Sequence, residues 1–162
     1  MIDLNLGCPQ EAAREGHFGA YLLAQKDWQL VENIGTAHLD LIIIVSPTRG
    51  LSEVVSAMSR SFTVPVSAKI RLCQPSPKTV DLASRLEAAG ASWITLHARS
   101  VSARRRRQGT ADLAQVKLLK EALRIPVISN GNVRRYSDLE DNLRFTGADG
   151  VMVGETLLGN PS

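Results

Sequence analysis

The stretch Asp3–Pro9, with the sequence DLNLGCP, decides the fold prediction. Residues 2–5 predict a short apolar strand, which runs into a glycine turn and delivers Cys8 at its carboxyl end. That end of a strand is where (β/α) architectures build their active sites. Gly7 allows a tight turn and Pro9 removes a backbone donor, which favours an exposed thiol at the end of the strand. The alternative is a buried cysteine that acts as a small hydrophobic side chain.

The rest of the chain alternates between predicted helices and strands. Further strands are predicted at residues 64–70, 93–97, 125–130 and 150–154, and helices at 18–34, 54–58, 79–89, 112–123 and 137–145. The strands recur at intervals of about 30 residues, the size of a strand plus its crossover helix. Their near-continuous apolar runs suit a parallel sheet that is covered on both faces. Gly90 is predicted to end one helix, and Ser137 to cap the start of another.

Length and composition predict one soluble domain. The chain has 162 residues, of which 44% are hydrophobic and 22% are charged. Its two cysteines form neither a disulfide framework nor a zinc pattern, and no metal is expected. The sequence shows no secretory signal and no apolar run long enough to span a bilayer. We therefore expect an intracellular protein of the cytoplasm, with the nucleus as an alternative, and no membrane partner.

Basic residues gather in one place. The net charge is +3, and the run Arg104–Arg107 alone exceeds that surplus. The run lies in the long polar loop that follows the strand ending at His97. A charged loop is most often a solvated face, but four arginines could also neutralise RNA phosphates. Aromatic residues make up only 4% of the chain, which argues against a nucleic-acid platform of stacked rings.

Two cations stand at the end of the strand predicted at residues 64–70. Lys69 and Arg71 are two positions apart, so their side chains point to the same face, where they suit an anionic ligand. A lysine at a strand end otherwise extends into water. His97 ends the next strand. It is either a candidate site residue at this end of the sheet or a core histidine that is hydrogen-bonded to the backbone.

Small residues follow the last two strands. Asn130, Gly131 and Asn132 follow one of them, and Gly154 follows the other. Small residues at these positions let backbone amides approach a phosphate closely. Barrels of this type often place a phosphate site after their last two strands. Taken alone, however, the Asn-Gly pair is an ordinary turn signal.

In this order, the motifs resemble those of the tRNA-dihydrouridine synthases, flavoenzymes that reduce uridines of tRNA. The resemblance rests on the DLNLGCP stretch, Gly19–Ala20, the Lys69–Arg71 element, the His97–Ser100 segment and the two glycine-containing strand ends. It implies an α/β fold, a partial TIM (β/α)8 barrel with about five of the eight strands. It also implies FMN as the cofactor, NADPH or NADH as the reductant and tRNA as the partner.

The resemblance implies a role for each candidate residue. Cys8 is the general acid that protonates uracil C5 while the hydride of reduced FMN reaches C6. The residues expected at the substrate uridine are Asn5, Arg71 and Arg99. The residues expected at the flavin are Lys69, His97, Asn130, Gly131, Asn132, Gly154 and Glu155.

Several positions depart from the family pattern. Ala98 stands where the family has glycine, and Glu155 stands where many members have arginine. Glu155 and the segment His17–Ala20 resemble the eukaryotic branch that acts on D-loop positions 16 and 17. Residues 35–52 interrupt the pattern and are interpreted as an insertion, either a surface loop or untranslated sequence carried into the chain.

The chain resembles a fragment of such a synthase. Family members carry three further barrel strands before Asp3 and a helical tRNA-binding domain after the barrel. Five strands cannot close an eight-stranded barrel, so we expect exposed sheet edges and a poorly soluble or inactive polypeptide. Two alternatives stay open. One is another FMN-dependent barrel oxidoreductase, such as a dihydroorotate dehydrogenase, and the other is a non-catalytic fragment that binds RNA through Arg104–Arg107 or binds nothing.

Overall fold

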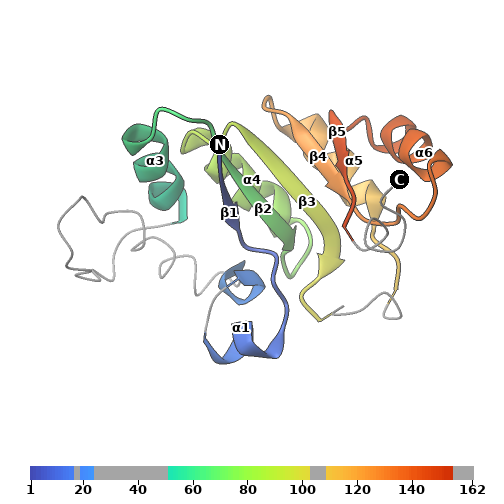
Figure 1. The fold of residues 1–162 in the computed structure, drawn as a ribbon, viewed down its shortest axis with the longest axis horizontal. Coiled ribbons are helices and arrows are strands. Elements are labelled where there is room, and N and C mark those ends of the chain that lie inside the picture. The colour runs from blue at the N-terminus through green and yellow to red at the C-terminus, as the bar shows by residue number, and fades with distance from the viewer. Residues whose placement is uncertain (17–18, 24–50, 103–108, 155–162) are drawn as a thin grey trace.

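The computed structural model describes residues 1–16, 19–23, 51–102 and 109–154 (Figure 1). Its strands, all parallel, form one sheet in chain order. The strands are β1 (Ile2–Asn5), β2 (Val66–Leu72), β3 (Trp93–Ser100), β4 (Val127–Asn130) and β5 (Gly150–Met152). The helices are α1 (Glu11–Glu15), α3 (Leu51–Ser61), α4 (Lys78–Ala88), α5 (Leu113–Ala122) and α6 (Ser137–Thr146), with a 3-10 turn η1 (Gly19–Leu23). The predicted α/β fold of successive βα units is confirmed.

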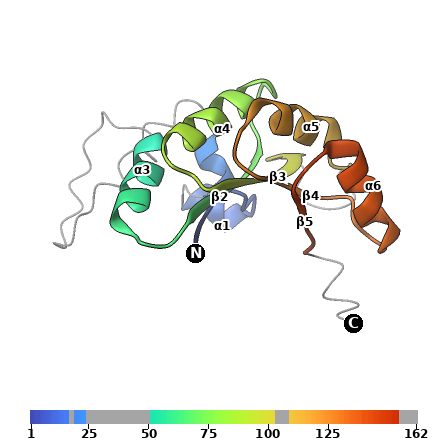
Figure 2. The same ribbon diagram turned by 90° about the horizontal axis from the view of Figure 1, so that it is seen from above.

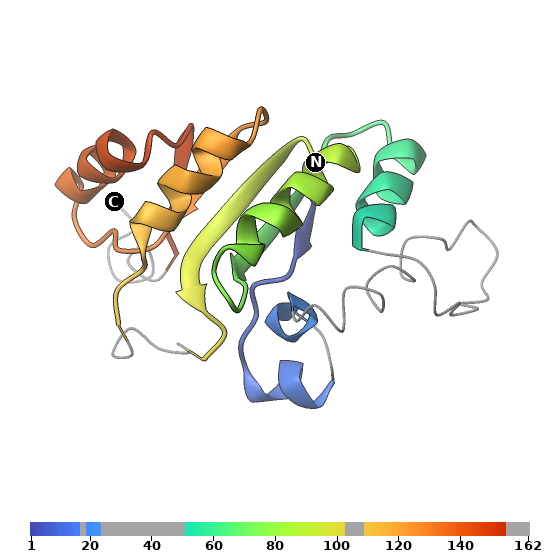
Figure 3. The same ribbon diagram turned by 180° about the vertical axis from the view of Figure 1, so that it is seen from behind.

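The sheet has one apolar face, and the helices cover it. Figures 2 and 3 show α3, α4, α5 and α6 on the same side of the strands. Side chains of this face and of the helices form the hydrophobic core, which includes Ile70, Leu96, Leu86 and Leu119 at 0% exposure. Burial of such side chains supplies the main driving force for folding.

The opposite face of the sheet is polar. Register pairs place Asp3 beside Ser67, Lys69 beside Thr95, and Arg71 beside His97. Because side chains alternate along a strand, this polar series lies on the side opposite to Ile70 and Leu96. The near-continuous apolar runs suggested a sheet covered on both faces, but in the described residues this second face carries the polar series, which alternates with the apolar side chains.

β3 is longer than predicted, and β2 has the predicted length but begins and ends later in the chain. β2 continues to Leu72, and β3 continues to Ser100, three residues past His97. The register shifts between Arg71 and Leu72, since Arg71 pairs with His97 but Leu72 pairs with Ser100. The shift marks a β-bulge or a similar irregularity of the strand pairing, and β-bulges often lie next to active sites, where they re-aim side chains.

Two predicted helix boundaries have different outcomes. Gly90 follows the cap residue of α4 and has a φ of +100°, the left-handed conformation typical of a glycine that ends a helix. The prediction that Ser137 caps α6 was wrong. The cap residue is Tyr136, and the carboxylate of Asp138 accepts the backbone amides of Arg134 and Arg135 at 2.7 and 2.9 Å. These bonds lower the pKa of Asp138.

The helix predicted at residues 18–34 begins as the 3-10 turn η1, and residues 24–34 lie outside the described residues. The predicted insertion at 35–52 also lies outside them, except that its last two residues begin α3. No helix in the described part of the chain has the length and hydropathy needed to cross a membrane.

Candidate active site

The loop after β1 holds Cys8 in a tightly bonded turn. The side-chain oxygen of Asn5 accepts the Gly7 amide at 2.9 Å, and the Cys8 carbonyl accepts the Ala20 amide at 3.0 Å. Gly19 has a φ of +62°, and a Cβ built on it would lie only 2.9 Å from the Cys8 Cβ. A side chain at Gly19 would therefore displace Cys8, which explains why the Gly-Ala pair accompanies the cysteine. Cys8 itself is half-buried.

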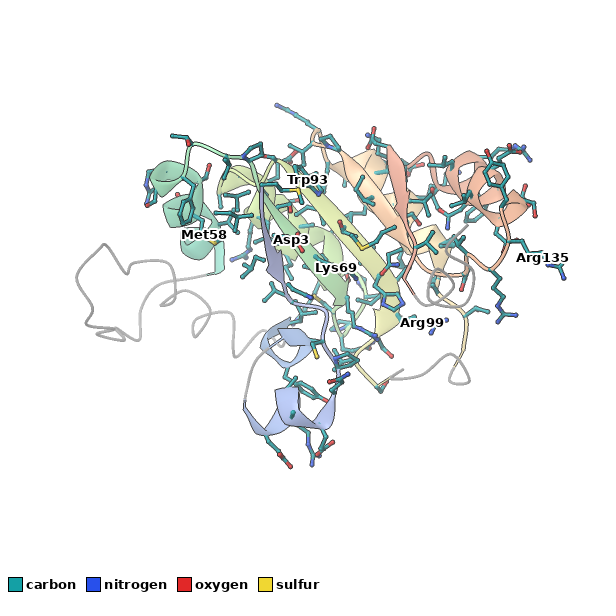
Figure 4. All side chains as sticks on the ribbon, viewed as in Figure 1. Asp3, Met58, Lys69, Trp93, Arg99 and Arg135 are labelled. Carbon is teal, nitrogen blue, oxygen red and sulfur yellow. The ribbon has the colours of Figure 1, made fainter. Side chains whose placement is uncertain are left out.

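A chain of hydrogen bonds joins the carboxyl ends of three strands. Lys69 on β2 donates from Nζ to the Asn130 side-chain oxygen on β4 at 2.9 Å. Asn130 in turn donates from Nδ2 to the Met152 carbonyl on β5 at 2.8 Å. Figure 4 shows Lys69 on the sheet and Arg99 toward the carboxyl end of β3. The structure therefore brings together side chains that are far apart in the sequence.

Arg71, which was expected at the substrate uridine, is a buried side chain. Its residue exposure is 5%, and it donates from Nε to the Gly7 carbonyl and from a terminal guanidinium nitrogen to the Ser100 carbonyl, each at 2.9 Å. It therefore connects the Cys8 loop with the end of β3. Burial, followed by the charge of Arg99, lowers the pKa of Arg71.

Positive charge accumulates at this edge of the sheet. Burial is the main cause that lowers the pKa of Lys69, the charge of Arg71 lowers it further, and Asp3 acts in the opposite direction. Burial also lowers the pKa of His97, together with the charges of Arg71, Lys69 and Arg99, to about 3. His97 is therefore a neutral imidazole at physiological pH, able to accept or donate a hydrogen bond without adding charge.

We expect the His97 ring to stay neutral down to a pH of about 3, whereas an unperturbed histidine titrates near 6.5. The unfolded chain binds this proton at higher pH than the folded chain, so the residue lowers stability as the pH falls from 6.5 toward 3. NMR titration of the ring, assigned by its loss in His97→Gln, measures the pKa. A ring that titrates near 6.5 would contradict the described electrostatics, and His97→Gln should flatten this part of the stability profile.

The turn after β4 is shaped by close packing. Gly131 has a φ of +130°, and an added Cβ would lie 2.6 Å from the Ala111 Cβ. Asn132 follows with a φ of +61°, accepts the Ala111 amide at 2.7 Å and donates to the Ala111 carbonyl at 2.7 Å. Both polar atoms of the Asn132 side chain therefore tie the turn to the segment before α5.

Gly131→Ala should destabilise the chain by about 1–3 kcal/mol, because a side chain there meets both an unfavourable backbone conformation and Ala111. Gly154→Ala is the matched control, since no described residue lies within 4 Å of a Cβ at that position. Its effect on the free energy of unfolding should stay within about 0.5 kcal/mol. Denaturant unfolding measures both variants, and equal effects would contradict the packing argument.

Not every candidate residue can be placed. Gly154 is exposed, while Glu155 and Arg104–Arg107 lie outside the described residues. Sequence reasoning missed Asp3 and Ser67, whose side chains form a 2.6 Å hydrogen bond on the polar face near Lys69. The signal for both was available, because every second residue of β1 and of β2 is polar.

The edge has the chemistry of a site for an anionic, hydrogen-bonding ligand. Arg99 Nε is buried and has no hydrogen-bond partner among the described residues, so it is a donor in need of an acceptor. Lys69 adds a cation, and His97 and Asn130 add neutral polar groups. These groups fit the phosphate and the hydrogen-bonding ring of a flavin nucleotide. Within the described ranges, no group of three or more His, Cys, Asp or Glu side chains could hold a metal ion.

Comparison with known proteins gives the family. The family model for "Dihydrouridine synthase (Dus)" matches residues 1–39 and 45–162. The chain is 37% identical to a "tRNA-dihydrouridine(16/17) synthase [NAD(P)(+)]-like" protein of Mus musculus, over 99% of this chain and 29% of the relative. It is also 37% identical to a "tRNA-dihydrouridine(20a/20b) synthase [NAD(P)+]-like" protein of Homo sapiens, over 99% of this chain and 44% of the relative.

A third relative is the "tRNA-dihydrouridine(16/17) synthase [NAD(P)(+)]" of Saccharomyces cerevisiae, 30% identical over 99% of this chain and 33% of the relative. The chain thus spans less than half the length of the relatives it matches. Its parallel βα units, in chain order, are part of the TIM barrel on which this family is built. The chain belongs to the dihydrouridine synthase family.

Proposed function

We propose that this chain is the catalytic part of an enzyme that reduces uridine to 5,6-dihydrouridine in tRNA. One observation carries the proposal: the Cys8 loop and the cationic edge of the sheet are joined directly, because Arg71 bonds to the Gly7 carbonyl. The loop that carries the Cys8 thiol is therefore bonded to the strand that carries the cations, which supports a site shared by a proton donor and an anionic cofactor. The comparisons support this assignment through relatives named as tRNA-dihydrouridine synthases.

Cys8 is the proposed proton donor. Reduction of the uracil C5=C6 bond adds a hydride to C6 and a proton to C5, and Cys8 supplies the proton and regains one from solvent. The bonded turn holds the backbone of Cys8 in position, which supports a general acid that must stay close to its substrate. FMN, when bound, supplies the hydride, and NADPH or NADH replaces the electrons. The "NAD(P)" in the relatives' names supports a nicotinamide reductant.

The proposed flavin contacts lie along the strand ends. Lys69 would favour negative charge on the reduced ring, and the neutral His97 would offer a hydrogen bond without repelling that charge. Asn130 holds the Lys69 ammonium in position. Gly131 leaves the turn without a side chain that would clash with Ala111, and Asn132 bonds the turn to Ala111. Gly154 and Glu155 complete the proposed set after β5.

The proposed substrate side is tRNA. Asn5, Arg71 and Arg99 are the proposed contacts of the substrate uridine, and Arg104–Arg107 would meet RNA phosphates. We assign the D-loop uridines at positions 16 and 17 as targets, which the 16/17 names of two relatives support. The activity is proposed to be intracellular, in the cytoplasm or the nucleus. Family membership favours this function over a dihydroorotate dehydrogenase.

The domain organisation of the protein is also a proposal. We propose that residues 1–162 are a partial FMN-binding barrel, that 35–52 are an insertion, and that further barrel strands and a helical tRNA-binding domain complete the enzyme. The unmatched residues 40–44 fall inside the proposed insertion. β1 and β5 are the edge strands of the described sheet, so a second candidate is a non-catalytic fragment.

The visible absorption spectrum tests the flavoenzyme assignment. The purified chain is incubated with FMN, desalted, and then mixed with NADPH or NADH without oxygen. We expect retained flavin absorbance that the nicotinamide bleaches. A colourless protein after desalting would contradict the proposal that these strand ends hold the flavin, and it would favour the non-catalytic alternative.

A further inference from the structure

The backbone around Cys8 is bonded on both sides by side chains from other elements. The Gly7 carbonyl, just before Cys8, accepts Arg71 Nε at 2.9 Å. The Pro9 carbonyl, just after it, accepts the Tyr21 hydroxyl at 3.2 Å. We propose that Arg71 and Tyr21 form a clamp that positions the Cys8 thiol. Arg71 is then a positioning residue, and Tyr21 gains a role that no motif had given it.

The Arg71 side of the clamp depends on the shape of guanidinium. Its two recorded bonds run to opposite neighbours of β2: Nε reaches Gly7 after β1, and a terminal nitrogen reaches Ser100 at the end of β3. Both acceptors are backbone carbonyls, and the residue is 5% exposed. A planar guanidinium can hold two carbonyls in fixed directions, whereas a lysine ammonium acts as a single point charge. The register shift pairs Leu72, the residue after Arg71, with Ser100.

The Tyr21 side of the clamp depends on one hydroxyl. Tyr21 belongs to η1, whose Ala20 amide already bonds to the Cys8 carbonyl at 3.0 Å. Proline has no backbone N–H, so the carbonyl is the only backbone group of Pro9 that can be held by a hydrogen bond. Three successive carbonyls, those of Gly7, Cys8 and Pro9, are thus each bonded to a different residue. Such bonding fixes the backbone from which the Cys8 thiol extends.

The catalytic meaning of the clamp rests on the proposed function, because a proton donor must stay within hydrogen-bond reach of the atom it protonates. The existence of the clamp does not depend on the proposed function. It is a property of the free chain, and it can be measured without tRNA, flavin or nicotinamide.

The rate at which iodoacetamide alkylates Cys8 in the full chain measures how firmly the clamp holds the Cys8 loop. Cys73 provides an internal reference, because burial raises its pKa to about 11 and its exposure is 2%. We expect Arg71→Lys, which keeps the positive charge, and Tyr21→Phe, which removes only the hydroxyl, each to raise the Cys8 alkylation rate several-fold. Arg85→Lys, a matched change on the surface of α4, should leave the rate unchanged. Mass spectrometry of the two cysteine peptides separates the sites.

Hydrogen exchange gives the second readout. The Ala20 amide should exchange faster in both clamp variants, because its acceptor is the Cys8 carbonyl, while amides of β3 should keep their protection. Faster exchange throughout β3 in Arg71→Lys would indicate a general loss of stability in that variant. Tyr21→Phe alone would then test the clamp. An unchanged Cys8 rate in Tyr21→Phe would then overturn the clamp, as would unchanged rates in both variants. Failure to form dihydrouridine would overturn only the proposed function.

Discussion

Cys8→Ala should lower dihydrouridine formation by about 10²- to 10⁴-fold, the usual contribution of a positioned general acid. Without the thiol, the proton for uracil C5 must come from water that the site does not orient. The effect is measured in a chimera in which this chain replaces the matching stretch of the Saccharomyces cerevisiae synthase. Such a chimera supplies the segments of the relative that this chain does not span. Mass spectrometry of digested tRNA quantifies the product.

Cys73→Ala is the control for this substitution. Cys73 is buried at the end of β2, and its backbone amide donates to the Thr79 hydroxyl, a bond that alanine keeps. The control chimera should retain activity within a few-fold. Equal losses in the two variants would indicate a general defect of folding, whereas full activity of Cys8→Ala would contradict the proposed role of Cys8 as proton donor.

Lys69→Ala should weaken FMN binding by about 10- to 100-fold, which corresponds to the loss of one charge-assisted hydrogen bond. The substitution removes the cation nearest to the proposed ring site and leaves Asn130 without the donor recorded in the structure. Lys69→Arg, which keeps the charge, should recover part of the affinity. Quenching of FMN fluorescence on titration with protein gives the dissociation constant.

Lys117→Ala provides the matched control for charge. Lys117 is exposed on α5, away from the strand ends, so its loss changes the net charge equally without touching the site. We expect its FMN affinity to match that of the unchanged chain. If Lys69→Ala binds FMN as tightly as Lys117→Ala does, the flavin does not lie against Lys69.

Much of the fold could be predicted because its signals are local. Apolar runs separated by glycine and proline gave the strands and their order, and parallel pairing then placed Lys69, His97 and Asn130 at one edge. The ends of β2 and β3 could not be predicted. Both strands continue past the register shift at Arg71, which is a feature of their pairing and not of either strand's own sequence.

The roles of individual site residues were harder to predict for the same reason. Arg71 was expected at the uridine, but its recorded partners are carbonyls 64 and 29 residues away in the sequence. Asn132 was expected at the flavin, yet both of its polar atoms bond to Ala111, 21 residues away. Alternation along a strand gives the face on which a side chain lies, but it cannot give the partner that the side chain meets there.

The most direct test is the dihydrouridine content of tRNA in Saccharomyces cerevisiae that lacks its tRNA-dihydrouridine(16/17) synthase and carries the chimera instead. We predict that dihydrouridine returns at positions 16 and 17 with the Cys8 chimera and stays absent with the Cys8→Ala chimera. Return of the modification with both chimeras would contradict the role of Cys8. Its absence with both, in cells that contain soluble chimera, would contradict the claim that this chain carries the catalytic residues of a working synthase.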